Sequence, residues 1–252
     1  MTVLLDKIEK YWDGRVDGYS EVNVAELNSL KKQTWLQLIY EQVPEAKNNS
    51  LRVLDVGTGP GFFAISLAEC GHRVTAVDYT QAMLDRAREN AGEQAANIDF
   101  IRMDAHRLDF DEGSFDLVIS RNLTWTLAEP SKAYKSWHRV LAKGGCLLNF
   151  DANWYLHVHD EDKRREYEQD RLNTKLNGLN DHYTCTDTDA MEKIAADLPL
   201  SRLLRPQWDA QVLLDIGFEN LFMDRVVGRR VWDREELVNY HSTPLFMIGA
   251  KK

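Results

Sequence analysis

The sequence has few cysteines, no basic excess and no long apolar run, and each shortage argues against a class of protein. Its three cysteines, Cys70, Cys146 and Cys185, lie far apart and form no CxxC pair. A disulfide framework and a cysteine-based zinc site are therefore not expected. No apolar stretch reaches about 18 residues, which argues against a membrane span. The first residues lack the basic and then apolar pattern of a signal peptide, so we expect a cytoplasmic protein.

The charge balance is acidic, with 31 Lys and Arg against 40 Asp and Glu and a net charge of −9. A large non-specific nucleic-acid interface needs a basic field, so no nucleic-acid partner is expected. Hydrophobic residues make up 44% and charged residues 28% of the 252 residues, as in ordinary globular proteins. This composition excludes a mainly disordered chain, a collagen-like repeat and a coiled coil.

Strand and helix patterns alternate through residues 51–151, which indicates a parallel sheet covered on both faces. Five strands are expected there, and two more near residues 218–227 and 245–248, which we expect to be antiparallel neighbours. We interpret the chain as one domain in four parts. These are an N-terminal helical cover (1–50), a cofactor-binding core (51–151), a helical insert (152–205) and the end of the sheet (206–252).

A glycine-rich turn follows the first expected strand and precedes a helix, as in nucleotide-binding sites. Gly57, Gly59 and Gly61 let a ligand approach the backbone closely. Asp78 ends the second strand, where a carboxylate can accept hydrogen bonds from two ribose hydroxyls. Asp104 follows the third strand and could accept from an adenine amino group. The competing interpretation is a plain turn with solvated acids at the strand ends.

The spacing of the glycines separates two nucleotide chemistries. Dinucleotide folds carry G-x-G-x-x-G, whose third glycine eases helix packing. Here Phe62 holds that position, and the third glycine comes one place earlier, at Gly61. Asp55 precedes the turn by two residues and could orient either the loop or a ligand ammonium group. A dinucleotide-dependent oxidoreductase therefore remains only a rival hypothesis.

The sequence resembles the class I S-adenosylmethionine-dependent methyltransferases over residues 50–151, and plausibly over the last two strands. The matching blocks are Leu54–Phe62, Val77–Leu84, Met103–Ala105, Phe115–Val118 and Trp137–Gly145. The resemblance implies an α/β, Rossmann-like sheet of seven strands, mostly parallel with an antiparallel last strand. Helices should cover both faces, and a helical lid should be inserted after the fifth strand. The implied cofactor is S-adenosylmethionine, with S-adenosylhomocysteine as product.

The resemblance also implies which residues contact this cofactor. The glycine turn should line its methionine part, Asp78 its ribose, and the residues after the third and fourth strands its adenine and sulfonium. An aromatic N-terminal segment should close over it, although packing under the first helix explains those aromatics equally well. The full set is Tyr11, Trp12, Tyr19, Asp55, Gly57, Thr58, Gly59, Gly61, Phe62, Asp78, Tyr79, Met83, Asp104, Ala105, Arg121 and Asn122.

The methyl acceptor is less well determined. The place where relatives that methylate nucleic-acid or protein amides carry Asn/Asp-Pro-Pro-Tyr holds residues 121–125, Arg-Asn-Leu-Thr-Trp. This departure favours a small-molecule acceptor, although the acceptor atom, O, N, S or C, stays open. The segment after the fifth strand offers polar and π contacts together. Expected substrate contacts are Trp125, Asn153, Trp154, Tyr155, His182 and Tyr183. Candidate catalytic residues are Asn122, Asp151, Trp154 and His157.

Other interpretations remain open from the sequence. His157-x-His159 with Asp160 suggests a metal site, but spacing fixes no third ligand, so no metal is expected. Methyl transfer can proceed largely by positioning, so a general base is not required. A tRNA or protein acceptor, and a non-catalytic S-adenosylmethionine sensor, are the main alternatives. The chain is expected to be a monomer or a homodimer.

Overall fold

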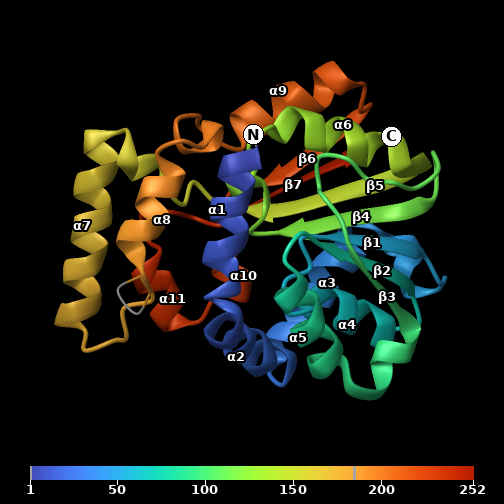
Figure 1. The fold of residues 1–252 in the computed structure, drawn as a ribbon, viewed down its shortest axis with the longest axis horizontal. Helices are drawn as coiled ribbons and strands as arrows, with labels where there is room; N and C mark the ends of the chain where they lie inside the picture. The colour runs from blue at the N-terminus through green and yellow to red at the C-terminus, as the bar shows by residue number, and fades with distance from the viewer. Residues whose placement is uncertain (1, 184–185) are drawn as a thin grey trace.

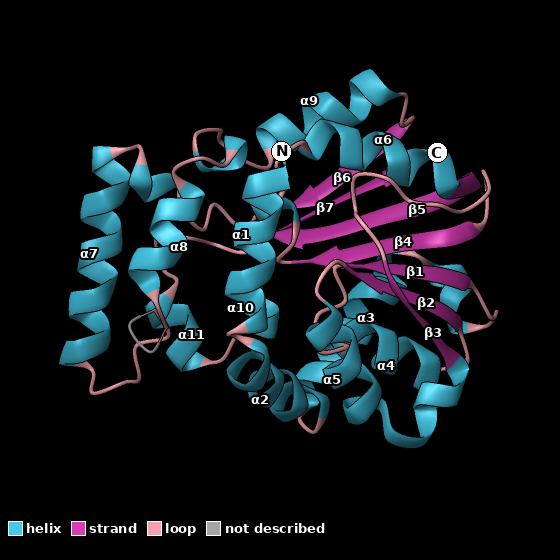
Figure 2. Ribbon diagram, in the orientation of Figure 1, coloured by secondary structure: helices cyan, strands magenta, loops and turns pink. Residues whose placement is uncertain are grey.

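The computed structural model describes residues 2–183 and 186–252, and it is built around one seven-stranded sheet. Cys185 lies outside the described residues. The strands follow the order β3-β2-β1-β4-β5-β7-β6 (Figures 1 and 2). Their bounds are β1 Arg52–Val56, β2 Arg73–Asp78, β3 Ile98–Arg102, β4 Phe115–Arg121, β5 Leu141–Asp151, β6 Asn220–Asp224 and β7 Phe246–Lys251.

The sheet is parallel from β3 to β5, and only β7 runs against its neighbours. Strand β7 pairs antiparallel with both β5 and β6. The predicted Rossmann-like sheet with an antiparallel last strand is therefore confirmed. The order places β1 beside β4, where the strand order reverses. In open α/β sheets, ligands bind outside the carboxyl ends of the strands at such a point.

Helices cover both faces of the sheet. One face is covered by α3, α4 and α5, and the other by α6 and α9 (Figure 1). The bounds are α3 Leu30–Gln42, α4 Phe62–Glu69, α5 Gln81–Ala91, α6 Pro130–Val140 and α9 Gln207–Ile216. Trp35 of α3 and Trp137 of α6 are almost fully buried, one in each core. Both tryptophans therefore pack in the core.

The N-terminal segment is helical over most of its length. It forms α1 (Thr2–Asp13) and α2 (Val16–Leu27), with the short break Gly14-Arg15 between them. Helix α1 stands across the carboxyl ends of the strands (Figure 1). Its apolar side chains Leu5, Ile8 and Trp12 follow helical spacing and face the interior.

The segment after β5 is helical, as predicted. It contains α7 (Glu161–Leu176) and α8 (Thr188–Ala195), and it lies at one end of the molecule (Figure 1). The side chain of Asp187 caps α8 by accepting from Ala190 N at 3.0 Å. Two short helices near the C-terminus, α10 (Gly228–Val231) and α11 (Arg234–Asn239), pack between this insert and the sheet. No helix among the described residues is both long enough and apolar enough to cross a membrane.

Candidate active site

A hollow opens at the carboxyl ends of β1, β2 and β4, beneath α1. It encloses about 800 Å³ of empty space, its mouth included. Its lining is mostly apolar with a few polar side chains, as is common where small organic ligands bind. The predicted cofactor residues that line it are Trp12, Tyr19, Gly57, Gly59, Asp78, Tyr79, Met83, Asp104, Ala105, Arg121 and Asn122. The structure thus brings most of the predicted set to one place.

The glycine turn, residues 57–61, is shaped by bonds to the end of β2. Gly57 N and Thr58 N both donate to Val77 O, at 2.8 and 3.0 Å. Gly57 has φ +70°, and a Cβ on it would lie 2.7 Å from the side chain of Leu123. Gly59 has φ +53° and lies against the Tyr19 ring. Only glycine fits both positions without strain.

Asp78 connects the glycine turn to the start of α5. Its carboxylate accepts from Gly59 N and from Thr80 N, each at 2.9 Å. Thr80 is the residue before α5, and its side chain makes no capping hydrogen bond to that helix among the described residues. Burial raises the pKa of Asp78, and the backbone N–H groups oppose that shift. A carboxylate held in this way at a cleft wall can accept hydrogen bonds from ligand hydroxyls.

Asp55 lies beneath the glycine turn and is 2% exposed. Its Oδ2 accepts from Thr58 Oγ1 at 2.7 Å and from Ala64 N at 3.1 Å. Burial raises the pKa of Asp55 to about 6. Asp55, Thr58 and Phe62 line a small cavity that adjoins the main hollow through Gly57 and Tyr19. They support the turn from behind.

At the adenine-side wall predicted from the sequence, Asp104 pairs with a buried histidine. Asp104 Oδ1 lies 2.6 Å from His106 Nδ1 and also accepts from His106 N. His106 Nε2 accepts from Glu129 N at 3.2 Å, so Nδ1 carries the proton in this arrangement. The hydrogen bond from His106 lowers the pKa of Asp104. The sequence interpretation missed His106, which also lines the hollow.

Arg121 ends β4 and Asn122 follows it, and the two side chains differ in whether their polar atoms already have partners. Arg121 pairs with Glu26 of α2 at 2.9 Å, and its guanidinium lies 4.3 Å from the Phe62 ring centre. Asn122 has φ +56°, an uncommon value for a residue other than glycine. Its side-chain Oδ1 is buried and has no hydrogen-bond partner among the described residues. A ligand donor would satisfy that oxygen.

Besides Asp55, Thr58 and Phe62, five predicted cofactor or catalytic residues do not line the main hollow. Tyr11 packs edge-on to Trp12, and Gly61 packs against Ala87. The carboxylate of Asp151 is fully buried and bonded to Arg205 at 2.6 Å. Trp154 donates its indole N–H to that carboxylate at 3.1 Å. His157 is 5% exposed, lies 3.0 Å from a Glu192 oxygen and stacks on Tyr167.

The predicted substrate residues also lie outside the main hollow. Trp125 stacks on Tyr155 with ring centres 4.9 Å apart, and Asn153 borders a separate recess beside the insert. Tyr183 is buried with the Arg171 guanidinium 4.5 Å over its ring. Trp125 and Tyr155 pack with apolar side chains of α1 and α8, and Tyr183 packs against Tyr167 within the insert. The sequence indicated that these side chains could make polar and π contacts, but it did not indicate which residues they would contact.

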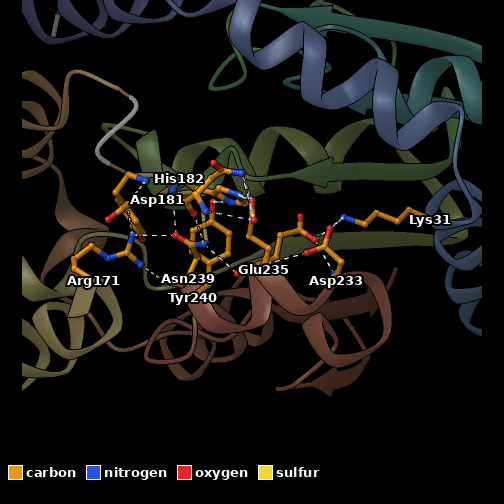
Figure 3. Close-up of polar contacts among 11 residues, drawn as sticks. Lys31, Arg171, Asp181, His182, Asp233, Glu235, Asn239 and Tyr240 are labelled. Atoms are coloured by element: carbon orange, nitrogen blue, oxygen red, sulfur yellow. Dashed lines mark hydrogen bonds and ion pairs between the residues drawn. The ribbon is translucent and has the colours of Figure 1, made fainter. Parts of the chain in front are cut away.

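His182 belongs to a polar cluster that ties the insert to α11 (Figure 3). Its ring nitrogens lie 2.8 Å from Glu235 and 3.2 Å from the Tyr240 hydroxyl. Lys31 of α3 pairs with Asp233 at the other end of α11. Helix α11 therefore bridges the insert and the core, and His182 has a structural place there. No group of three or more potential metal ligands gathers within the described ranges.

Residues 53–145 match the family model for a methyltransferase domain. A phosphatidylethanolamine N-methyltransferase of Cereibacter sphaeroides is 39% identical over 37% of this chain and 47% of its own. A ubiquinone biosynthesis O-methyltransferase of Caulobacter sp. is 26% identical over 55% and 56%. The chain thus spans about half the length of these curated relatives.

Solved structures share the fold over more of the chain. A Thermotoga maritima protein described as a methyltransferase, possibly a histamine N-methyltransferase, is 18% identical. It covers 96% of this chain and 99% of its own, with a TM-score of 0.58. A Haemonchus contortus phosphoethanolamine N-methyltransferase, solved with S-adenosylmethionine, is 17% identical, covers 86% and 52%, and has a TM-score of 0.58. At these identities the likeness shows the fold.

Proposed function

We propose that this chain, which carries a class I S-adenosylmethionine-dependent methyltransferase domain, transfers the methyl group of S-adenosylmethionine to a small-molecule acceptor. The observation that carries the proposal is the hollow beneath α1, which is lined by Asp78, Asp104 and Asn122, the last with an unpartnered side-chain oxygen among the described residues. The relatives act on different acceptors, so their names do not identify the acceptor of this chain.

The residues of the hollow fit the cofactor group by group. The carboxylate of Asp78 would accept from the ribose hydroxyls, and Asp104 would accept from the adenine amino group. Tyr79 and Met83 would flank the base. Gly57 and Gly59 line the hollow without side chains, so the methionine part could approach the backbone of the glycine turn closely. When bound, S-adenosylmethionine supplies an electrophilic methyl group on a sulfonium.

The chain's contribution to the reaction is mainly positioning. Trp12 and Tyr19 lie with ring centres 5.6 Å apart on the wall of the hollow, where an aromatic face can stabilise a cationic ligand. Helix α1 covers the hollow and would exclude water from it. In-line displacement needs the acceptor atom held against the methyl group, and such orientation can supply much of the rate enhancement.

The cover over the hollow favours a small acceptor over a macromolecular one. Leu5, Ile8 and Glu9 of α1 line the hollow from above. Glu9 also pairs with Arg102 at 2.6 Å, across the end of β3. A tRNA would in addition meet a chain with a net charge of −9.

Calorimetry with S-adenosylhomocysteine tests the cofactor assignment. We expect binding by the wild-type chain and at least a hundredfold weaker binding by Asp78→Ala. Asp85→Ala is the matched control, because Asp85 lies on exposed helix surface in the following α5 and pairs only with neighbours on that helix. Absent binding by the wild-type chain, or tight binding of NAD instead, would refute the proposal.

The acceptor is tested by incubating the chain and methyl-labelled S-adenosylmethionine with a cell-extract metabolite fraction, and separately with the RNA and protein fractions. We expect label to appear in the metabolite fraction. Label found only on RNA or protein would replace the small-molecule proposal with a macromolecular one. Cofactor binding with no label in any fraction would favour a sensor.

A further inference from the structure

A buried ionic network lies directly behind the end of β4. The guanidinium of Arg205 donates to Asp151 Oδ2 at 2.6 Å, to Thr124 Oγ1 at 2.7 Å, and to both oxygens of Asp209 at 2.7 and 2.9 Å. The side chains of the arginine and both aspartates are fully buried. Burying three charges is expensive, and such groups persist only where their geometry is well satisfied.

Thr124 joins this network to the turn after β4, residues 122–125. Its hydroxyl donates to Asp151 Oδ2 at 2.5 Å and accepts from Arg205 and from Asn149 Nδ2 at 3.0 Å. The next residue, Trp125, donates its backbone N–H to the same Asp151 oxygen at 2.9 Å. The turn is therefore bonded to the network through both a side chain and the backbone.

The same turn forms a wall of the hollow. Asn122 and Leu123 line it, and the Leu123 side chain lies over Gly57. The Trp125 indole N–H donates to Asn122 O at 3.0 Å, and Asn122 keeps its left-handed φ of +56°. Asparagine tolerates a left-handed φ, and the bond from the indole holds the Asn122 carbonyl in this conformation.

The network also fixes the base of the insert. Asn153, at its start, and Arg205, at its end, exchange two hydrogen bonds, at 2.9 and 3.0 Å. Arg205, at the end of the insert, thus bonds both to the start of the insert and to the turn that faces the hollow. Neither Arg205 nor Thr124 lines the main hollow, so each acts on it only through the turn.

We infer that Arg205 and Thr124 are positioning residues of the proposed methyl-transfer site, which hold residues 122–125 so that Asn122 and Leu123 face the ligand. This inference rests on the proposed function. A residue with a purely structural role would change the stability of the fold without changing the wall of the hollow. The two roles can therefore be separated by measurements made on the turn itself.

The test compares Thr124→Val with Thr174→Val. Both threonines are fully buried, but among the described residues the Thr174 hydroxyl bonds only to Asp170 O within α7. The first measurement is the exchange rate of the Trp125 indole proton by NMR, assigned with Trp125→Phe. The second is the affinity for S-adenosylhomocysteine by calorimetry. Thr124→Ser, which keeps the hydroxyl, is the rescue variant.

We expect Thr124→Val to speed Trp125 indole exchange at least tenfold and to weaken S-adenosylhomocysteine binding at least tenfold. Thr124→Ser and Thr174→Val should stay within about twofold of the wild type in both. Equal values for the two valine variants in either measurement would overturn the inference. If Thr124→Val does not fold, Arg205→Lys replaces it with the same expectations, because a lysine lacks the planar fork. Absent binding by the wild-type chain would instead refute the proposed function.

Discussion

The glycine turn and the helical insert hold their polar side chains in place by different means. Around the turn, Asp78 accepts from the backbone N–H groups of Gly59 and Thr80. In the insert, side chains bond to partners far along the sequence, as Arg171 does to Asn239. The first arrangement follows from backbone geometry, and the second follows from tertiary packing. Single changes should therefore alter ligand binding in the first region and local stability in the second.

The largest contrast is expected between Gly57→Ala and Gly178→Ala. Both glycines have left-handed φ, +70° and +65°. A Cβ at Gly57 would meet Leu123 at 2.7 Å, whereas one at Gly178, after α7, meets nothing within 4 Å. Gly57→Ala should weaken S-adenosylhomocysteine binding at least a hundredfold. Gly178→Ala should cost only the backbone strain, about 1 kcal/mol, with binding unchanged.

Calorimetry and urea unfolding of both glycine variants measure these effects. If the two variants lost the same amount of S-adenosylhomocysteine affinity, the loss would come from backbone strain and not from the contact between the new Cβ and Leu123. In that case the glycine turn and the insert would not differ in the way proposed.

The next effect concerns the cluster in Figure 3, where Arg171 ties α7 to α11. Its guanidinium pairs with Asp181 at 2.6 Å and donates to the side chain and carbonyl of Asn239. Arg171→Met should cost about 2 kcal/mol, because these bonds are charged and largely buried. Amide exchange should speed up in α7 and α11 and stay unchanged in β1–β5, with ligand affinity retained.

Arg165→Met is the matched control, because Arg165 lies on the same helix and pairs only with exposed Asp162. Exposed pairs of this kind contribute little, so exchange should match the wild type. If Arg171→Met instead speeded exchange throughout the sheet, the insert and the core would form one cooperative unit. A substitution in the insert would then not act locally, and the proposed difference between the insert and the glycine turn would be wrong.

The same difference explains how far the sequence predicted the structure. Gly57, Gly59 and Asp78 could be placed on the hollow because strand, turn and helix follow one another locally. Asp151 and Trp154 ended in a buried network because Arg205, more than 50 residues later, reaches both the strand end and the turn. No local sequence pattern predicts these contacts of Arg205.

The N-terminal helices show an intermediate case. The spacing of Leu5, Ile8 and Trp12 is a helical signal that could have predicted α1 and its contact with the hollow. No spacing pattern in the sequence predicts that His106 lines the hollow. Its role depends on Asp104, two residues earlier, and on the backbone of Glu129 from a separate loop.

A smaller effect is expected from the pKa of Asp55, which burial raises to about 6. The carboxylate forms as pH rises through 6, and a charged Asp55 attracts a ligand ammonium group. Affinity for S-adenosylhomocysteine should therefore rise several-fold, up to about tenfold, between pH 5 and pH 7. Asp55→Asn should flatten this dependence. Asp170→Asn, at a buried aspartate of the insert, should leave it unchanged.

Without ligand, the same shift acts on stability with a definite sign. The folded state binds a proton to Asp55 more readily than the unfolded chain does. The contribution of Asp55 to the free energy of unfolding should therefore fall as pH rises from about 4 to about 6. Urea unfolding of the wild type and Asp55→Asn at these two pH values measures the difference. A contribution that rises over this range would contradict the assignment.

The smallest effect belongs to His157 of the insert, and its sign is opposite. Burial lowers the pKa of His157, although Glu192 opposes that shift. The unfolded chain therefore binds the proton more readily near pH 6.5, and the contribution of His157 to stability should fall as pH drops from 7.5 to 5.5. His157→Gln should remove this loss, whereas His241→Gln, at an exposed histidine, should not. Urea unfolding at pH 7.5, 6.5 and 5.5 measures both. If His157→Gln and the wild type gave the same pH profile, the insert would lack the acid sensitivity that sets it apart from the glycine turn, where acid favours the folded state.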